Sequence, residues 1–176
     1  MDEIFIDQVS SDVIDKDYLN KFYTDQSFEV TFVYKSEFNN AKYLRSYLSI
    51  ILDILSVNSL RKNRFILIMD ELNNNAIEYG TVEWWYNFFR FISKENDGKL
   101  SINLEVEDQW NSQTSKKAIE MEYLRLCRLN QWFDKHGSIR WRWLFLIITK
   151  LVDNLYFKDS SSWWLIVWTD KILEKK

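Results

Sequence analysis

The chain has 176 residues, 47% of them hydrophobic and 28% charged, which fits one domain with a sizeable core. Its net charge of −3 gives no electrostatic reason to expect nucleic acid or an anionic membrane as a partner. The single cysteine, Cys127, cannot form an internal disulfide, so we expect a cytoplasmic protein. The acidic first residues are unlike a signal peptide, and no apolar run is long enough to cross a bilayer.

The composition is unusual in three respects: there is no proline, and there are only three glycines but nine tryptophans. Average usage predicts roughly 12 glycines in a chain of this length. The shortfall of about nine glycines equals the tryptophan count. The positions of the tryptophans, described below, make this coincidence informative.

No repeat, low-complexity tract or linker divides the sequence. We expect residues 1–27 to form an N-terminal extension with a first strand near residues 4–6, and residues 28–176 to form one domain. Alternating apolar residues predict a strand over residues 28–34, and apolar residues at helical spacing predict a helix over residues 38–55.

The second half of the chain predicts a longer series of elements. They are a helix over 62–79 ending at Gly80, strands over 86–93 and 99–107 joined by the turn 96–98, a helix over 115–130, an irregular segment over 131–143, a helix over 144–152, and strands over 155–157 and 165–167. Helices grouped between antiparallel strands predict an α+β two-layer sandwich, a mixed, mostly antiparallel sheet with helices on one face.

Residues 70–80, with the sequence DELNNNAIEYG, contain the first candidate site. Glu71 and Asn75 are four apart and project from the same face of a helix. On spacing alone, a solvated polar face is the simpler interpretation. The full pattern E-L-x-x-N-A-x-E-[HY]-G, however, resembles the N box of GHKL (Bergerat-fold) ATPases. The resemblance implies that the domain binds ATP, with Glu71 as the catalytic base and Asn75 as the ligand of Mg²⁺.

The strand predicted over residues 99–107 is followed by the sequence DQWNS at 108–112. In the GHKL family an aspartate after this strand binds the adenine amino group, and a glycine follows two residues later. The resemblance therefore implies that Asp108 is the adenine ligand, with Trp110 at the position of the glycine. The family usually has a threonine on the last strand, where this chain has Leu165 and Ile166.

The family's third element is G-x-G-L at the start of an apolar helix, where backbone amides bind the phosphates. The corresponding residues here are Arg140, Trp141, Arg142, Trp143 and Leu144. The resemblance places them at the phosphates, with Arg140 or Arg142 offsetting the developing charge. An indole at both glycine positions would obstruct the close backbone approach that phosphate binding requires.

We therefore hypothesise that the positions written as tryptophan are encoded by UGA codons, which the source organism decodes as glycine. An aromatic core and a membrane-facing aromatic belt are the alternatives. A core does not easily accommodate Trp141 and Trp143 flanked by arginines, and a belt predicts no coincidence with glycine positions. The hypothesis predicts UGA codons at positions 84, 85, 110, 132, 141, 143, 163, 164 and 168.

Within the GHKL superfamily, the length and the order of elements resemble most closely the bacterial anti-sigma factors that are also serine protein kinases. The resemblance implies a cytoplasmic regulator that binds Mg-ATP, sequesters a sigma factor and phosphorylates an antagonist protein, with homodimerisation left open. The only histidine, His136, lies in the lid region, which excludes a complete sensor histidine kinase. A non-catalytic ATP-binding interaction module, a separate catalytic subunit of a two-component system, and a tryptophan-rich membrane-surface protein remain as alternatives.

Overall fold

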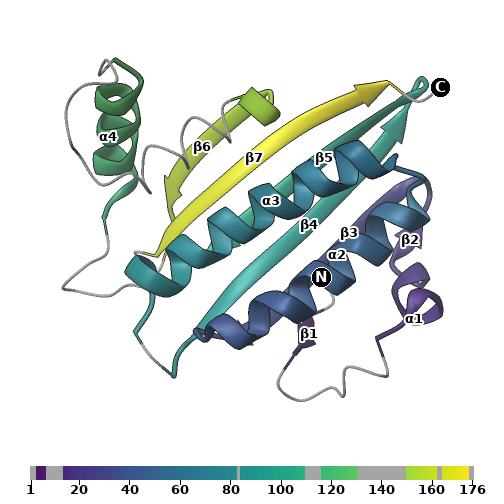
Figure 1. The fold of residues 1–176 in the computed structure, drawn as a ribbon, viewed down its shortest axis with the longest axis horizontal. Helices are drawn as coiled ribbons and strands as arrows, with labels where there is room; N and C mark the ends of the chain where they lie inside the picture. Colours follow the sequence, from purple (N-terminus) through teal and green to yellow (C-terminus); the bar gives the residue numbers. More distant parts are fainter. Residues whose placement is uncertain are drawn as a thin grey trace.

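The computed structural model describes residues 3–6, 14–82, 84–109, 116–130, 150–161 and 164–174. Within them the chain is an α+β two-layer sandwich, a seven-stranded sheet with helices packed on one side (Figure 1). The strands are β1 (Glu3–Phe5), β2 (Tyr23–Thr24), β3 (Ser27–Lys35), β4 (Tyr86–Asn96), β5 (Lys99–Glu107), β6 (Asn154–Asp159) and β7 (Leu165–Glu174). The helices are α1 (Lys16–Asn20), α2 (Ala41–Ile54), α3 (Ser59–Asn75) and α4 (Ala118–Asn130).

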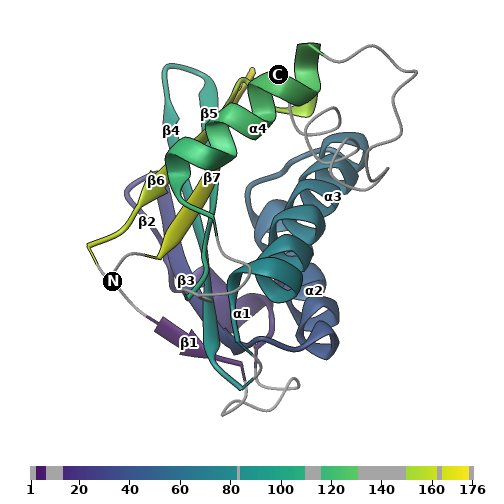
Figure 2. The same ribbon diagram turned by 90° about the vertical axis from the view of Figure 1, so that its left-hand side faces the viewer.

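The sheet order is β1-β3-β4-β5-β7-β6, and β2 pairs with β3. The pairing of β1 with β3 is parallel, and the other strand pairs are antiparallel. The edge-on view in Figure 2 shows α2 and α3 side by side in one layer against the sheet. The fold class expected from the sequence is confirmed.

The core lies between this helix layer and the sheet, as the alternation in the strands predicts. Phe32 of β3 is fully buried and stacks on Tyr47 of α2, with 5.5 Å between the ring centroids. It also stacks on Phe89 of β4, at 6.1 Å. The described part of the segment before residue 28 belongs to the same core, since Ile4, Ile14 and Leu19 are buried in it.

Helix α3 begins three residues before the predicted start, because Asn58 caps it by accepting a hydrogen bond from the Arg61 amide at 3.0 Å. The α-helix ends at Asn75 and continues as a single π-helical turn, η2 (Ala76–Gly80). The Thr81 amide donates to the Ala76 carbonyl at 3.0 Å, after which the backbone is extended. Gly80 is therefore the last helical residue, as expected.

The hairpin of β4 and β5 is tighter than the predicted three-residue turn. Asn96 is already paired with Lys99, so the turn consists of Asp97 and Gly98 alone. Both have positive φ values, 49° and 72°. Asp-Gly is a preferred pair for such two-residue hairpin turns, because glycine adopts this backbone region without steric cost.

Two other expectations differ from the structure, and a third concerns residues that lie mostly outside the described ranges. Helix α1 was not predicted, because five residues are too few to show a helical period. Strand β7 runs to Glu174 rather than to residue 167, since it pairs with β5 along its whole length. The helix expected over residues 144–152 lies mostly outside the described residues. None of the helices in the described ranges is long and apolar enough to cross a membrane.

Candidate functional site

A row of buried polar side chains crosses the helix-covered face at one end of the sheet. Tyr34 on β3 is paired with Asn87 on β4, and both are fully buried. The β4–β5 pairing ends at Phe88 and Glu107, which puts Asn87 opposite Asp108 at the next position. Three adjacent strands thus bring Tyr34, Asn87 and Asp108 into one line, which we call the polar row.

Asp108 is the residue of the polar row that the sequence predicted as an adenine ligand. It follows β5 directly, and its side chain is only 6% exposed. Its Oδ1 accepts a hydrogen bond from the Leu165 amide at 3.3 Å, and its own amide donates to the Leu165 carbonyl at 3.1 Å. The carboxyl group is therefore held in a fixed position beside the first residue of β7.

Gly80 makes room for this carboxyl group. A Cβ added at position 80 would lie 2.6 Å from the Asp108 Cβ and closer still to Oδ2. A side chain at position 80 would force the Asp108 side chain to move, so glycine permits the close approach at the end of η2. The N-box resemblance ends on this glycine, and the fold brings it into contact with the second motif.

Burial raises the pKa of Asp108 from its ordinary value of 3.8 to about 7. The hydrogen bond from the Leu165 amide acts in the opposite direction, and the charge of Glu107 adds to the increase. Burial, and then the proximity of Asp108, raise the pKa of Tyr34 well above its ordinary value, so its hydroxyl stays protonated. A carboxyl group that titrates near neutral pH inside a polar row is typical of a functional site.

Hydrogen bonds tie the polar row to the end of the helix layer. The Tyr34 hydroxyl donates to Oδ1 of Asn73 on α3, and the Asn73 Nδ2 donates to the Met69 carbonyl at 2.9 Å. The Thr81 hydroxyl donates to Oδ1 of Asn87 and accepts from the Gln109 amide at 3.1 Å. These contacts fix the position of Asp108 relative to α3 from both sides.

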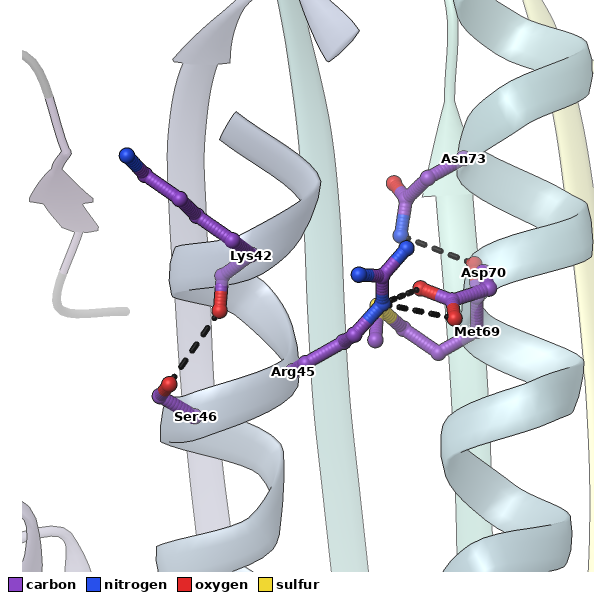
Figure 3. Close-up of polar contacts among 6 residues, drawn as sticks. All are labelled: Lys42, Arg45, Ser46, Met69, Asp70 and Asn73. Atoms are coloured by element: carbon purple, nitrogen blue, oxygen red, sulfur yellow. Dashed lines mark hydrogen bonds and ion pairs between the residues drawn. The ribbon is translucent and has the colours of Figure 1, made fainter. Parts of the chain in front are cut away.

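The flank of α3 that faces α2 carries Asp70. Figure 3 shows its carboxylate meeting Arg45 of α2, with Nε at 2.7 and 2.8 Å from the two oxygens. Asn73 lies one turn further along α3 and hydrogen-bonds back to Met69 (Figure 3). This side of the helix is therefore occupied by structural contacts.

Glu71 and Asn75 belong to the opposite flank of α3. Helical spacing aligns them with Arg64 and Ile68, at intervals of four, three and four residues. Arg64 and Ile68 line a depression of about 290 Å³ together with Leu151 and residues 171–174 of β7. In Figure 1, α2 lies on one side of α3 and β7 on the other. Glu71 and Asn75 thus project from the β7 side of the helix.

The side chain of Asn75 is suited to act as a ligand of Mg²⁺. Its Nδ2 donates to the Glu71 carbonyl, so the atom that it presents to a ligand is the carbonyl oxygen Oδ1. A carboxamide oxygen is a hard ligand, and Mg²⁺ is commonly held by one or two protein oxygens together with substrate phosphates. Glu71 is partly buried beside it.

The predicted phosphate-binding residues Trp110, Arg140, Trp141, Arg142, Trp143 and Leu144 lie outside the described residues. Four other tryptophans are described. Trp84 has a φ of 78°, in a backbone region that strongly favours glycine, and its side chain is 68% exposed. Trp164 stacks on Phe88, and Trp168 contacts Tyr156. The backbone at position 84 thus agrees with the glycine hypothesis, whereas Trp164 and Trp168 have aromatic partners.

The sequence did not identify Tyr34, Asn73, Thr81 or Asn87 as part of the site. A signal for two of them was present: the alternation of β3 and β4 continues into Tyr34 and Asn87, which places polar side chains on the core-facing side. Comparison with known proteins adds no assignment, since no protein-family model and no curated protein matches the chain.

Proposed function

We propose that this chain is a GHKL-type ATP-binding regulator that binds Mg-ATP and phosphorylates a serine of an antagonist protein. The observation that carries the proposal is the buried carboxyl group of Asp108, held against Gly80 and the Leu165 amide. Asp108 has no ion-pair partner within the described ranges, and a protein rarely buries such a carboxyl group unless it serves a ligand or a reaction.

Asp108 supplies an acceptor for the adenine amino group. When the carboxylate is ionised, Oδ1 is oriented by the Leu165 amide and Oδ2 lies beside Gly80. A buried acceptor in a fixed position discriminates strongly between nucleotide bases, because a base without the matching donor leaves the acceptor without a partner. The adenine would thus bind at the junction of η2, β5 and β7.

Glu71 and Asn75 are proposed to act at the phosphate end of the nucleotide. Asn75 would hold Mg²⁺ through Oδ1, and the metal ion would neutralise charge on the phosphates. Glu71 would accept the proton of the incoming serine hydroxyl as a general base. Asp70, the neighbouring carboxylate, takes no part because it faces α2 and pairs with Arg45.

The proposed partners are a sigma factor and the antagonist protein that receives the phosphate, in the cytoplasm. This part of the proposal depends on the resemblance of motif order and length to anti-sigma factors that are serine kinases. A non-catalytic ATP-binding module is the second candidate. The two candidates differ in the role of Glu71, because a binding module needs no base.

The first experiment tests nucleotide binding by calorimetry. The chain with glycine at positions 110, 141 and 143 should bind Mg-ATP, and the chain as written should bind far more weakly, because indoles would fill the space of the phosphates. Equal affinity of the two chains would contradict the assignment of the phosphate loop.

The second experiment separates binding from catalysis in the glycine-containing chain. Glu71→Ala should retain most of the ATP affinity and lose transfer of labelled phosphate to the antagonist, since a base acts mainly in the transition state. Asn75→Ala should lose both. Asp70→Ala, on the other flank of α3, is the matched control and should keep both. Undiminished transfer by Glu71→Ala would remove Glu71 as the base. Absence of transfer by the chain with intact Glu71, with ATP still bound, would favour the non-catalytic ATP-binding module.

A further inference from the structure

Asn87, at the centre of the polar row, has an amide group with no partner among the described residues. The side chain is fully buried, and its Nδ2 makes no hydrogen bond there. Buried amide donors are almost always paired in native proteins, so an unpaired one calls for an explanation. It is not explained by a loose fit, because the oxygen of the same amide is bonded to Thr81.

In the structure the oxygen of the Asn87 amide contacts Thr81, and its nitrogen is left unpaired among the described residues. The Thr81 Oγ1 already accepts the Gln109 amide hydrogen at 3.1 Å, and its own proton is directed to Asn87. A hydroxyl that donates requires an acceptor, which is Oδ1 of Asn87. The NH₂ group of Asn87 is therefore the end that has no partner among the described residues.

The unpaired donor stands next to the proposed adenine acceptor. The β4–β5 register ends at Phe88 and Glu107, and its continuation by one position sets Asn87 opposite Asp108, where Cβ atoms are about 5 Å apart. Two side chains that start this close can direct a donor and an acceptor at two neighbouring groups on one edge of a base. On the Watson–Crick edge, adenine presents its amino donor beside the ring-nitrogen acceptor N1, whereas guanine presents a carbonyl acceptor beside an N–H donor.

We propose that Asn87 is a specificity-determining residue whose Nδ2 donates, directly or through one water, to N1 of the adenine whose amino group Asp108 accepts. This inference rests on the proposed ATP binding. Guanine reverses both groups, so it would face Asp108 with an acceptor and Asn87 with a donor. The pair would then reject guanine at both positions rather than at one.

The test changes one atom of the ligand and leaves the protein intact. Calorimetry on the chain with glycine at positions 110, 141 and 143 compares ATP with 1-deaza-ATP, which lacks the N1 acceptor. We expect 1-deaza-ATP to bind about 10-fold more weakly, the usual effect of leaving one buried donor without a partner. The analogue 7-deaza-ATP should bind as tightly as ATP.

Variants of Asn87 complete the cycle. Asn87→Ala and Asn87→Leu both remove the donor, and neither places a second titratable carboxyl beside Asp108, so both should bind ATP and 1-deaza-ATP equally. Ser93→Ala is the matched control, because Ser93 is a buried residue toward the other end of the same strand and its hydroxyl has no partner among the described residues. It should keep the 10-fold preference.

The outcomes separate this inference from the function on which it rests. Equal binding of ATP and 1-deaza-ATP by the chain with intact Asn87 would overturn the role of Asn87 and leave ATP binding standing. Retained preference in both Asn87 variants would overturn it as well. If no adenosine nucleotide binds to the chain, the proposed function fails, and this inference fails with it.

Discussion

Two neighbouring rows of side chains cross the same face of the sheet, and their chemistry is opposite. One row contains Phe32, Phe89 and Val106. The other row is offset by two residues from the first on each chain segment and is the polar row of Tyr34, Asn87 and Asp108. The residues of both rows are nearly or fully buried, with exposed fractions of at most 6%.

The difference shows that burial alone does not identify a core. The apolar row is stabilised by the removal of its surface from water. The polar row loses the solvation of a carboxyl group, an amide and a phenol, and hydrogen bonds to Thr81, Asn73 and Leu165 offset part of this loss. A fold that keeps such a row gives up stability at one place, which is typical of sites retained for function.

The largest expected effect is in the apolar row. Phe89→Ala should lower the free energy of unfolding by about 3–5 kcal/mol, because it removes a fully buried ring that stacks on Phe32. Denaturant unfolding measures the change. Phe38→Ala, at a ring that is 54% exposed, is the control and should change stability by no more than about 0.5 kcal/mol. Similar losses for both variants would contradict the position of the core.

The polar row should behave in the opposite way. The folded state holds the proton of Asp108 more tightly than the unfolded state, because the pKa is about 7 rather than 3.8. Stability should therefore fall as the pH rises from 4 to 7, by up to about 4 kcal/mol at about 1.4 kcal/mol per pKa unit.

Asp108→Asn should remove this pH dependence, stabilise the chain at pH 8 and weaken ATP binding. Thermal unfolding across the pH range measures the first two effects, and calorimetry the third. A variant with the same pH profile as the original chain would show that Asp108 is not the titrating group.

The two glycines provide a smaller and more specific test. Gly80→Ala places a methyl group against the Asp108 side chain and should cost about 1–3 kcal/mol. Gly98→Ala has open space around it, but its φ of 72° should cost about 1 kcal/mol. Both variants should lose stability in denaturant unfolding, and only Gly80→Ala should change ATP affinity. An equal effect of both on ATP affinity would contradict the contact between Gly80 and Asp108 as its cause.

The smallest effect concerns the turn that leads from η2 into β4. Trp84→Gly should stabilise the chain by about 1 kcal/mol. The backbone at position 84 has a φ of 78°, a left-handed conformation that is unfavourable for a bulky residue and that glycine adopts without strain. Trp85→Gly should bring no such gain, since Trp85 is also exposed but has no positive φ. A loss of stability in Trp84→Gly would show that the indole itself is needed there, and it would weaken the glycine hypothesis.

The sequence by itself determined the elements that have a strong local period. The alternation of β3, β4 and β5 and the helical spacing of α2 and α3 predicted the two-layer sandwich, because each pattern exposes an apolar face that the other must cover. It also predicted Glu71, Asn75 and Asp108 as candidates, since a motif is local in the chain. Helix α1 escaped because it is too short to carry a period.

The tertiary structure alone decided which of these residues meet. The register of β4 against β5 puts Asn87 opposite Asp108, and the π-helical turn brings Gly80 into contact with the same carboxyl group. No local pattern specifies either contact, because the partners are 21 and 28 residues apart in the chain. The same holds for the pKa of Asp108, since the burial that raises it comes from other strands and from the helix layer.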